Sequence, residues 1–103
     1  MNILDKILSH KKTEIEKIPE IHLESSNFKR LSLKKALKRD KISIIAEIKF
    51  ASPSEGIILE KGEHIQIAKD YENAGAAAIS VLTDRRFFNG DIKFLKDIKN
   101  AVN

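Results

Sequence analysis

The chain has 103 residues, a length that suits one domain of about 100–150 residues or part of a larger one. It has no cysteine, which excludes disulfides, thiolate metal sites and a cysteine nucleophile. No apolar run approaches the roughly 20 residues of a membrane span, and Asp5 and Lys6 interrupt the first apolar stretch, so no secretory signal is predicted. We therefore expect a cytoplasmic protein with no membrane partner.

The net charge of +4 comes from the N-terminal part of the chain. Residues 1–41 hold 11 basic and 6 acidic side chains, whereas residues 42–103 hold 8 basic and 9 acidic ones. The basic residues of the first part alternate with acidic residues and leucines at helical spacing, and no nucleic-acid-binding motif accompanies them. This favours a solvated helix face and no nucleic-acid partner; a basic nucleic-acid binder is kept as a third hypothesis.

Helical signals dominate the first part of the chain. Asn2 stands before an amphipathic run that Pro19 ends, and Ser32 is placed to cap a second run. The predicted elements, in order, are a helix over 3–18, a connector over 20–31 and a helix over 33–39.

The second part of the chain alternates strand and helix signals. Two nearly continuous apolar runs, 42–48 and 77–82, are rich in β-branched residues, as strands buried on both faces are. A helix is predicted over 63–74, with Gly75 after its end, and the segments 50–62 and 83–90 are predicted as loops. Two strand–helix units in series indicate a parallel sheet with right-handed crossovers, hence an α/β protein.

A final helix is predicted to begin after Asp91, which can cap it. The pair Asn89-Gly90 is a hairpin signal, but the residues after it repeat with helical spacing, so we reject a hairpin here. The apolar stripe of this helix is predicted to be Ile92, Leu95, Ile98 and Val102.

Glu47 and Lys49 end the first predicted strand and carry the strongest chemical signal. Alternate residues of a strand share a face, so these two side chains are expected on one side, opposite a wholly apolar side. In parallel α/β folds ligands bind at the carboxyl ends of the strands. From this pattern alone, a functional site and a simple ion pair are equally good interpretations.

Two loops and three histidines are the other candidates. The segment Ala51-Ser-Pro-Ser-Glu-Gly56 offers hydroxyls and backbone N–H groups to an anion, although the pattern alone favours an ordinary turn, and it is not a P-loop. In the loop 83–90, Phe87 and Phe88 are suited either to plugging the end of the sheet or to stacking on a planar ligand. The histidines are far apart, lack metal-ligand spacing and are expected at the surface: His10, His22 and His64.

Two long motifs resemble signatures of the indole-3-glycerol-phosphate synthase family. They are residues 45–56 (Ile-Ala-Glu-Ile-Lys-Phe-Ala-Ser-Pro-Ser-Glu-Gly) and residues 76–90 (Ala-Ala-Ala-Ile-Ser-Val-Leu-Thr-Asp-Arg-Arg-Phe-Phe-Asn-Gly). The N-terminal helical segment is similar to the extension that precedes the barrel in that family. The resemblance implies the N-terminal portion of a (β/α)8 TIM barrel, with the extension over 1–41 and the first two βα units over 42–103.

The resemblance also implies a decarboxylating lyase of tryptophan biosynthesis. Its phosphorylated small-molecule substrate, 1-(2-carboxyphenylamino)-1-deoxyribulose 5-phosphate, becomes indole-3-glycerol phosphate with loss of carbon dioxide and water, without an organic cofactor or a metal. Glu47 and Lys49 match the catalytic positions, and Lys49 also binds the carboxylate and phosphate end of the substrate. Ser52 and Ser54 match positions on the anthranilate side of the pocket, and Phe88 matches an aromatic stacking position.

Such barrels run to about 250 residues, so the resemblance places other parts of the site beyond residue 103. These are a general-acid lysine on the third strand, a glutamate on the fourth and the main phosphate site on the last two. We expect the chain alone to be inactive, to expose apolar side chains such as Ile45 and Leu82, and to associate with itself or with the rest of the barrel. The alternative is a non-catalytic split-barrel fragment or interaction module that needs a second chain.

Overall fold

The computed structural model describes residues 2–19, 30–60 and 62–102. The chain divides into two units, Met1–Leu31 and Ser32–Asn103, and each is described by itself. The domain boundary predicted after residue 41 stays a prediction. None of the described helices is long and apolar enough to cross a lipid bilayer.

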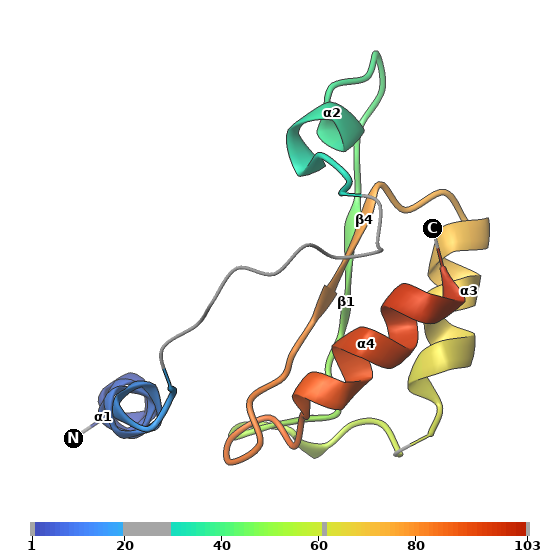
Figure 1. The fold of residues 1–103 in the computed structure, drawn as a ribbon. Helices are drawn as coiled ribbons and strands as arrows, with labels where there is room; N and C mark the ends of the chain where they lie inside the picture. Colours follow the sequence, from blue (N-terminus) through green and yellow to red (C-terminus); the bar gives the residue numbers. More distant parts are fainter. Residues whose placement is uncertain (1, 20–29, 61, 103) are drawn as a thin grey trace. The chain divides into compact units, whose positions relative to one another are not determined.

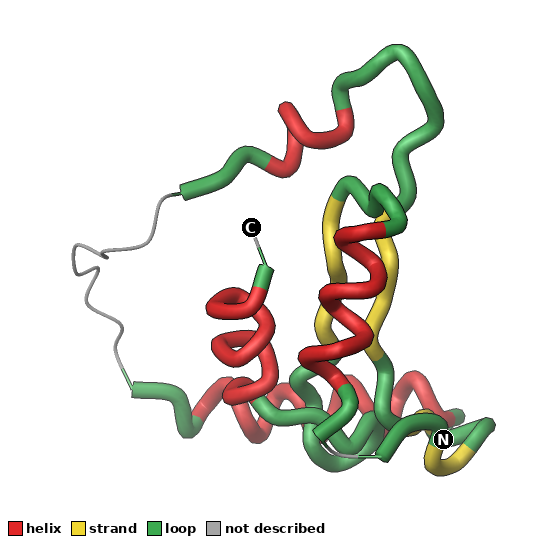
Figure 2. The backbone as a smooth tube through the Cα atoms, turned by 90° about the vertical axis from the view of Figure 1, so that its right-hand side faces the viewer, coloured by secondary structure: helices red, strands yellow, loops and turns green. Residues whose placement is uncertain are grey.

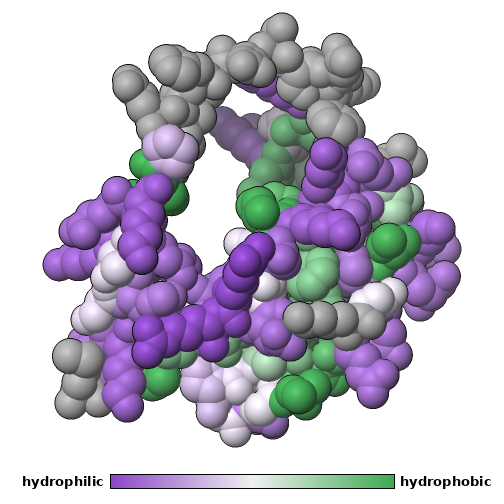
Figure 3. Space-filling view, turned by 60° about the horizontal axis from the view of Figure 1, so that its bottom comes forward, coloured by the Kyte–Doolittle hydropathy of each residue, from purple (hydrophilic) through white to green (hydrophobic). Residues whose placement is uncertain are grey.

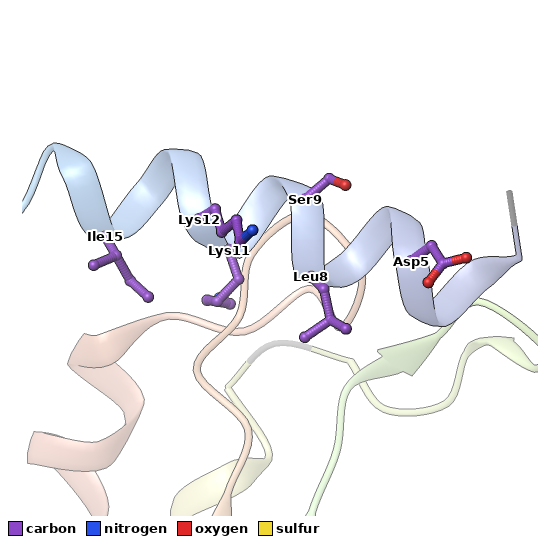
Figure 4. A pocket seen from close by; sticks show the side chains of 6 residues that line it. All are labelled: Asp5, Leu8, Ser9, Lys11, Lys12 and Ile15. Atoms are coloured by element: carbon purple, nitrogen blue, oxygen red, sulfur yellow. The ribbon is translucent and has the colours of Figure 1, made fainter.

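The first unit contains helix α1 (Ile3–Glu16), close to the predicted range. The Asn2 side chain accepts a hydrogen bond of 2.8 Å from the backbone N–H of Asp5, which confirms the predicted start. Leu8 and Ile15 project to the same side of this helix and Ser9 to the other (Figure 4). The predicted connector, apart from its last two residues, and His22 lie outside the described residues.

The second unit is built on two parallel strands, as the order of elements predicted. Strand β1 (Ile45–Ile48) pairs with β4 (Ala78–Val81), and Glu47 lies opposite Ser80 in the register. Both strands are shorter than the predicted runs. Helices α3 (His64–Asn73) and α4 (Ile92–Ala101) lie on one side of this sheet (Figure 1), and the view along the perpendicular direction shows α3 running beside the strands (Figure 2).

Short elements complete the second unit. Helix α2 (Leu33–Leu37) is capped by Ser32, as predicted, but ends two residues earlier than predicted. The predicted loop after β1 contains a small antiparallel hairpin, β2 (Ala51–Ser52) with β3 (Gly56–Ile57), where Gly56 has a φ of 69°. This hairpin was not predicted because strands of two residues carry no periodicity.

The core lies between the sheet and its two helices. Ile48 and Phe50 from β1 and its continuation pack with Ala68 of α3 and Ile98 of α4, and all four are buried. Within the described residues the strands are not buried on both faces. Ile45, on the other face, is 50% exposed, as expected for this part of a barrel by itself, whereas Leu82, also expected to be exposed, is half-buried. A two-stranded sheet covered by helices on one side leaves its other side open.

The start of α4 was predicted correctly and its apolar face only in part. Asp91 caps the helix by accepting a 2.9 Å hydrogen bond from the backbone N–H of Lys93, and no β-hairpin forms at Asn89-Gly90. Phe94, Ile98 and Val102, spaced four residues apart, face the core, whereas Ile92 and Leu95 of the predicted stripe are exposed. The predicted stripe omitted Phe94, because the apolar residues of this helix fit two overlapping helical faces and the sequence alone does not select between them.

The expectation of surface histidines is wrong for His64, which is only 5% exposed. Its ring lies against Phe50 and Phe94, with ring centroids 5.7 Å and 4.7 Å away, and its Nε2 is 3.1 Å from a carboxylate oxygen of Asp97. His10 is partly exposed and pairs with Glu14 at 2.7 Å. No group of three or more metal-ligating residues gathers among the described residues.

Candidate active site

Glu47 and Lys49 lie together at the carboxyl end of β1. The Lys49 Nζ is 3.7 Å from Glu47 Oε1, a loose ion pair whose side chains are 37% and 44% exposed. Ile48 and Phe50, the neighbours of Lys49 in the chain, are buried against the helices, so strand alternation turns the charged pair to the opposite side. Glu47 and Lys49 therefore lie on one face of the sheet, as predicted.

Glu47 is held from both sides of the sheet. Its Oε2 accepts a 3.3 Å hydrogen bond from the Ser80 hydroxyl of β4, and its backbone carbonyl accepts one of 3.2 Å from the Tyr71 hydroxyl of α3. The two carboxylate oxygens are thereby divided between Lys49 and Ser80. Sequence reasoning missed Ser80, although a hydroxyl in the middle of an apolar strand was the available signal.

The hairpin after β1 brings Ser52 and Ser54 together. Their hydroxyl oxygens are 3.4 Å apart, and Ser52 Oγ also accepts a 3.1 Å hydrogen bond from the backbone N–H of Glu55. The Ser52 hydroxyl thus stabilises the turn, which is the ordinary structural role of serine there. The hairpin therefore places the adjacent hydroxyls of Ser52 and Ser54 beyond the end of β1, the strand that carries the charged pair.

Phe88 lies in the separate loop that follows β4. Two hydrogen bonds to Asp84 close this loop. The Asp84 carboxylate accepts one of 2.8 Å from the Phe87 N–H, and the Asp84 backbone carbonyl accepts one of 2.7 Å from the Gly90 N–H. Arg86 lies 5.3 Å from the centre of the Phe87 ring. Phe88 is neither fully exposed nor buried, so both of its predicted uses, core plug and ligand contact, stay open.

Asp91, directly after this loop, carries a carboxyl group whose pKa is shifted. The hydrogen bond from the Lys93 backbone N–H lowers the pKa of the Asp91 carboxyl below its ordinary value, and nearby Arg85 lowers it further. Arg85 reaches the same carboxylate at 2.9 Å, although most of its side chain is in solvent. The loop therefore joins the cap of α4 to the end of β4.

Taken together, these features define the class: an α/β protein of parallel strands, with a carboxylate, an ammonium group and hydroxyls where the first strand ends. A family model described as indole-3-glycerol phosphate synthase matches residues 4–103. The chain belongs to the indole-3-glycerol phosphate synthase family.

Individual relatives agree with the family match. Proteins named indole-3-glycerol phosphate synthase from Geobacillus sp. (strain WCH70), Thermoanaerobacter sp. (strain X514) and Ruminiclostridium cellulolyticum are 48%, 43% and 44% identical to it. These alignments cover 96–97% of this chain but only 39–42% of each relative. The chain therefore spans about two fifths of the length of these relatives.

Proposed function

We propose that the protein carrying this sequence is an indole-3-glycerol-phosphate synthase, a decarboxylating lyase of tryptophan biosynthesis with a TIM-barrel fold. Residues 42–103 then supply the first two βα units of the barrel and residues 1–41 its N-terminal extension. The observation that supports this most directly is the family match over residues 4–103, combined with a carboxylate and an ammonium group 3.7 Å apart at the end of β1. The carboxyl ends of barrel strands are where such enzymes place their chemistry.

In this proposal Glu47 is the catalytic carboxylate of the first strand. Ring closure of 1-(2-carboxyphenylamino)-1-deoxyribulose 5-phosphate produces positive charge as an iminium forms, and a carboxylate already in position stabilises that charge as it develops. The hydrogen bond from Ser80 supports this role, because it restricts the orientation of the Glu47 carboxylate before substrate arrives. Loss of carbon dioxide and then water completes the indole ring.

Lys49 and the two loops bind substrate in the same proposal. The Lys49 ammonium group attracts the carboxylate and phosphate end of the substrate, and its loose contact with Glu47 leaves it able to turn toward that anion. Ser52 and Ser54 line the anthranilate side, for which their adjacent hydroxyls are suited. Phe88 stacks on the aromatic ring, an interaction worth about 0.5–1.5 kcal/mol beyond area burial.

The test uses the full-length protein and two substitutions. Glu47→Gln removes the charge that stabilises the transition state and should lower kcat by about 100-fold or more, with a smaller change in KM. Lys49→Ala removes a charged contact to the substrate and should mainly raise KM, by roughly 10-fold or more. Both constants are measured from the fluorescence of the indole product.

Glu55→Gln is the matched control. Glu55 is exposed in the turn of the hairpin, close in sequence to the site, so losing its charge should leave both constants unchanged. If Glu47→Gln and Lys49→Ala behave like this control, the assignment of the site is wrong.

A further inference from the structure

A buried pair behind the sheet joins the two helices of the second unit. His64, the first residue of α3, places its Nε2 3.1 Å from Oδ2 of Asp97 on α4. The His64 side chain is 6% exposed and the Asp97 side chain 28%. A carboxylate only accepts hydrogen bonds, so the contact assigns a proton to Nε2 and fixes the orientation of the ring.

The fixed ring in turn confines Phe50. Phe50 and Phe94 lie 4.6 Å apart between ring centroids, and His64 contacts both rings, so the three form one aromatic cluster. The Nδ1 of His64 is buried and has no hydrogen-bond partner in the described part of the chain. Asp97 is therefore the polar contact that determines how the ring is turned.

Phe50 is also the point at which the hairpin is attached to the sheet. Its carbonyl accepts hydrogen bonds from the N–H groups of Ile58, at 2.7 Å, and Leu59, at 3.0 Å, which closes the segment 51–57 on itself. Lys49 precedes Phe50 and Ser52 follows two residues later. A shift of Phe50 thus moves a candidate substrate-binding side chain on each side of it.

We infer that His64 and Asp97 are positioning residues: through Phe50 they set where Lys49 and the Ser52 hairpin stand. The effect on substrate rests on the proposed function, whereas the effect on the hairpin does not. Neither side chain belongs to the charged face of the sheet, because both lie with the helices on the side that buries Phe50.

Asp97→Ala tests this inference in the full-length protein, with Asp97→Asn as the conservative variant that keeps an oxygen able to accept from Nε2. The first measurement is amide hydrogen exchange. Asp97→Ala should accelerate exchange at Ile58 and Leu59 about 10-fold or more relative to Ala74 and Gly75, whose N–H groups bond at the far end of α3. Asp97→Asn should restore most of the protection.

The second measurement is the separation of KM from kcat. Asp97→Ala should raise KM about fivefold or more with a smaller change in kcat, and Asp97→Asn should stay within twofold of the unchanged protein. Asp70→Ala is the matched control. It removes an exposed carboxylate of α3 that accepts a hydrogen bond of 2.9 Å from the Gln66 side chain, and it should change neither KM nor kcat.

The outcomes separate the two proposals. Unchanged exchange at Ile58 and Leu59, or an acceleration equal to that at Ala74 and Gly75, overturns the positioning role and leaves the pair as a general stabiliser. Faster amide exchange at Ile58 and Leu59 alone, with an unchanged KM, supports the positioning role. That result counts against Lys49 and Ser52 as substrate contacts, and so against the proposed function.

Discussion

Gly90 shows how one residue without a side chain determines the geometry of a loop beside the candidate site. It is buried, and a Cβ added to it would lie 2.8 Å from the carbonyl carbon of Thr83 and still closer to the carbonyl oxygen of Leu82. The loop that carries Phe88 therefore returns directly onto the end of β4. The pair Asn89-Gly90 is a hairpin signal that the helical spacing after it led us to reject, and the role of Gly90 is to allow this close backbone approach.

Gly90→Ala should destabilise the full-length protein by roughly 1–3 kcal/mol or more, since the new methyl group meets backbone that has little room to move. Gly75→Ala is the comparison: Gly75 has a φ of 96° but open space around its Cα, so it reports the conformational cost alone, roughly 1–2 kcal/mol. Urea unfolding measures both. A Gly90→Ala protein as stable as the parent would show that the loop relaxes freely.

Helix α4 depends on the cap that begins it. The Asp91 carboxylate satisfies the Lys93 N–H at the end of the helix where backbone N–H groups carry partial positive charge. Its pKa is lowered in the folded protein, so it binds a proton less readily folded than unfolded. The stability that its charge provides is therefore complete above the ordinary carboxyl value of 3.8 and is lost as the pH falls through the lower, folded value.

Asp91→Ala should lower the Tm at neutral pH, and the gap from the unchanged protein should narrow as the pH falls below 3.8. Asp91→Asn keeps a capping oxygen without the charge, so it should retain more of the Tm at neutral pH than the alanine variant. Thermal unfolding followed by circular dichroism across this pH range measures both. Parallel loss of Tm in the unchanged and alanine proteins would contradict the assigned role of the charge.

At the scale of the whole molecule, the described residues leave much apolar surface uncovered. Ile42 is 89% exposed and Ile92 66%, and hydrophobic side chains appear at the surface in the space-filling view (Figure 3). Strands β1 and β4 pair only with each other in the described part of the chain, so each has an open edge. A closed barrel removes such edges, and unpaired ones promote association.

A polypeptide limited to residues 1–103 should therefore associate with itself and should not turn over substrate, because the family resemblance assigns the general-acid lysine and the main phosphate site to later strands. Adding the rest of the barrel as a second chain should reduce self-association and restore turnover. Sedimentation velocity and product fluorescence measure the two effects. A compact monomer that unfolds cooperatively would refute the first expectation, and turnover well above background by residues 1–103 alone would refute the second.

Local patterns were sufficient for the order of the helices and the two parallel strands and for the charged pair. Caps such as Asn2 and Asp91 act within three residues, and alternation along β1 places Glu47 and Lys49 together whatever surrounds the strand. The resemblance to the family also came from contiguous residues, and it was confirmed over residues 4–103.

Packing between distant elements accounts for what these patterns missed. The burial of His64 depends on Asp97 and Phe94, some 30 residues further along the chain, and the hydrogen bond from Ser80 to Glu47 depends on the register of two strands 33 residues apart. The choice of Phe94 over Leu95 for the core likewise depends on distant residues, because the Phe94 ring packs against Phe50 and His64. Such contacts are absent from any short window of sequence, because they exist only once distant strands have paired and the helices have packed on the sheet.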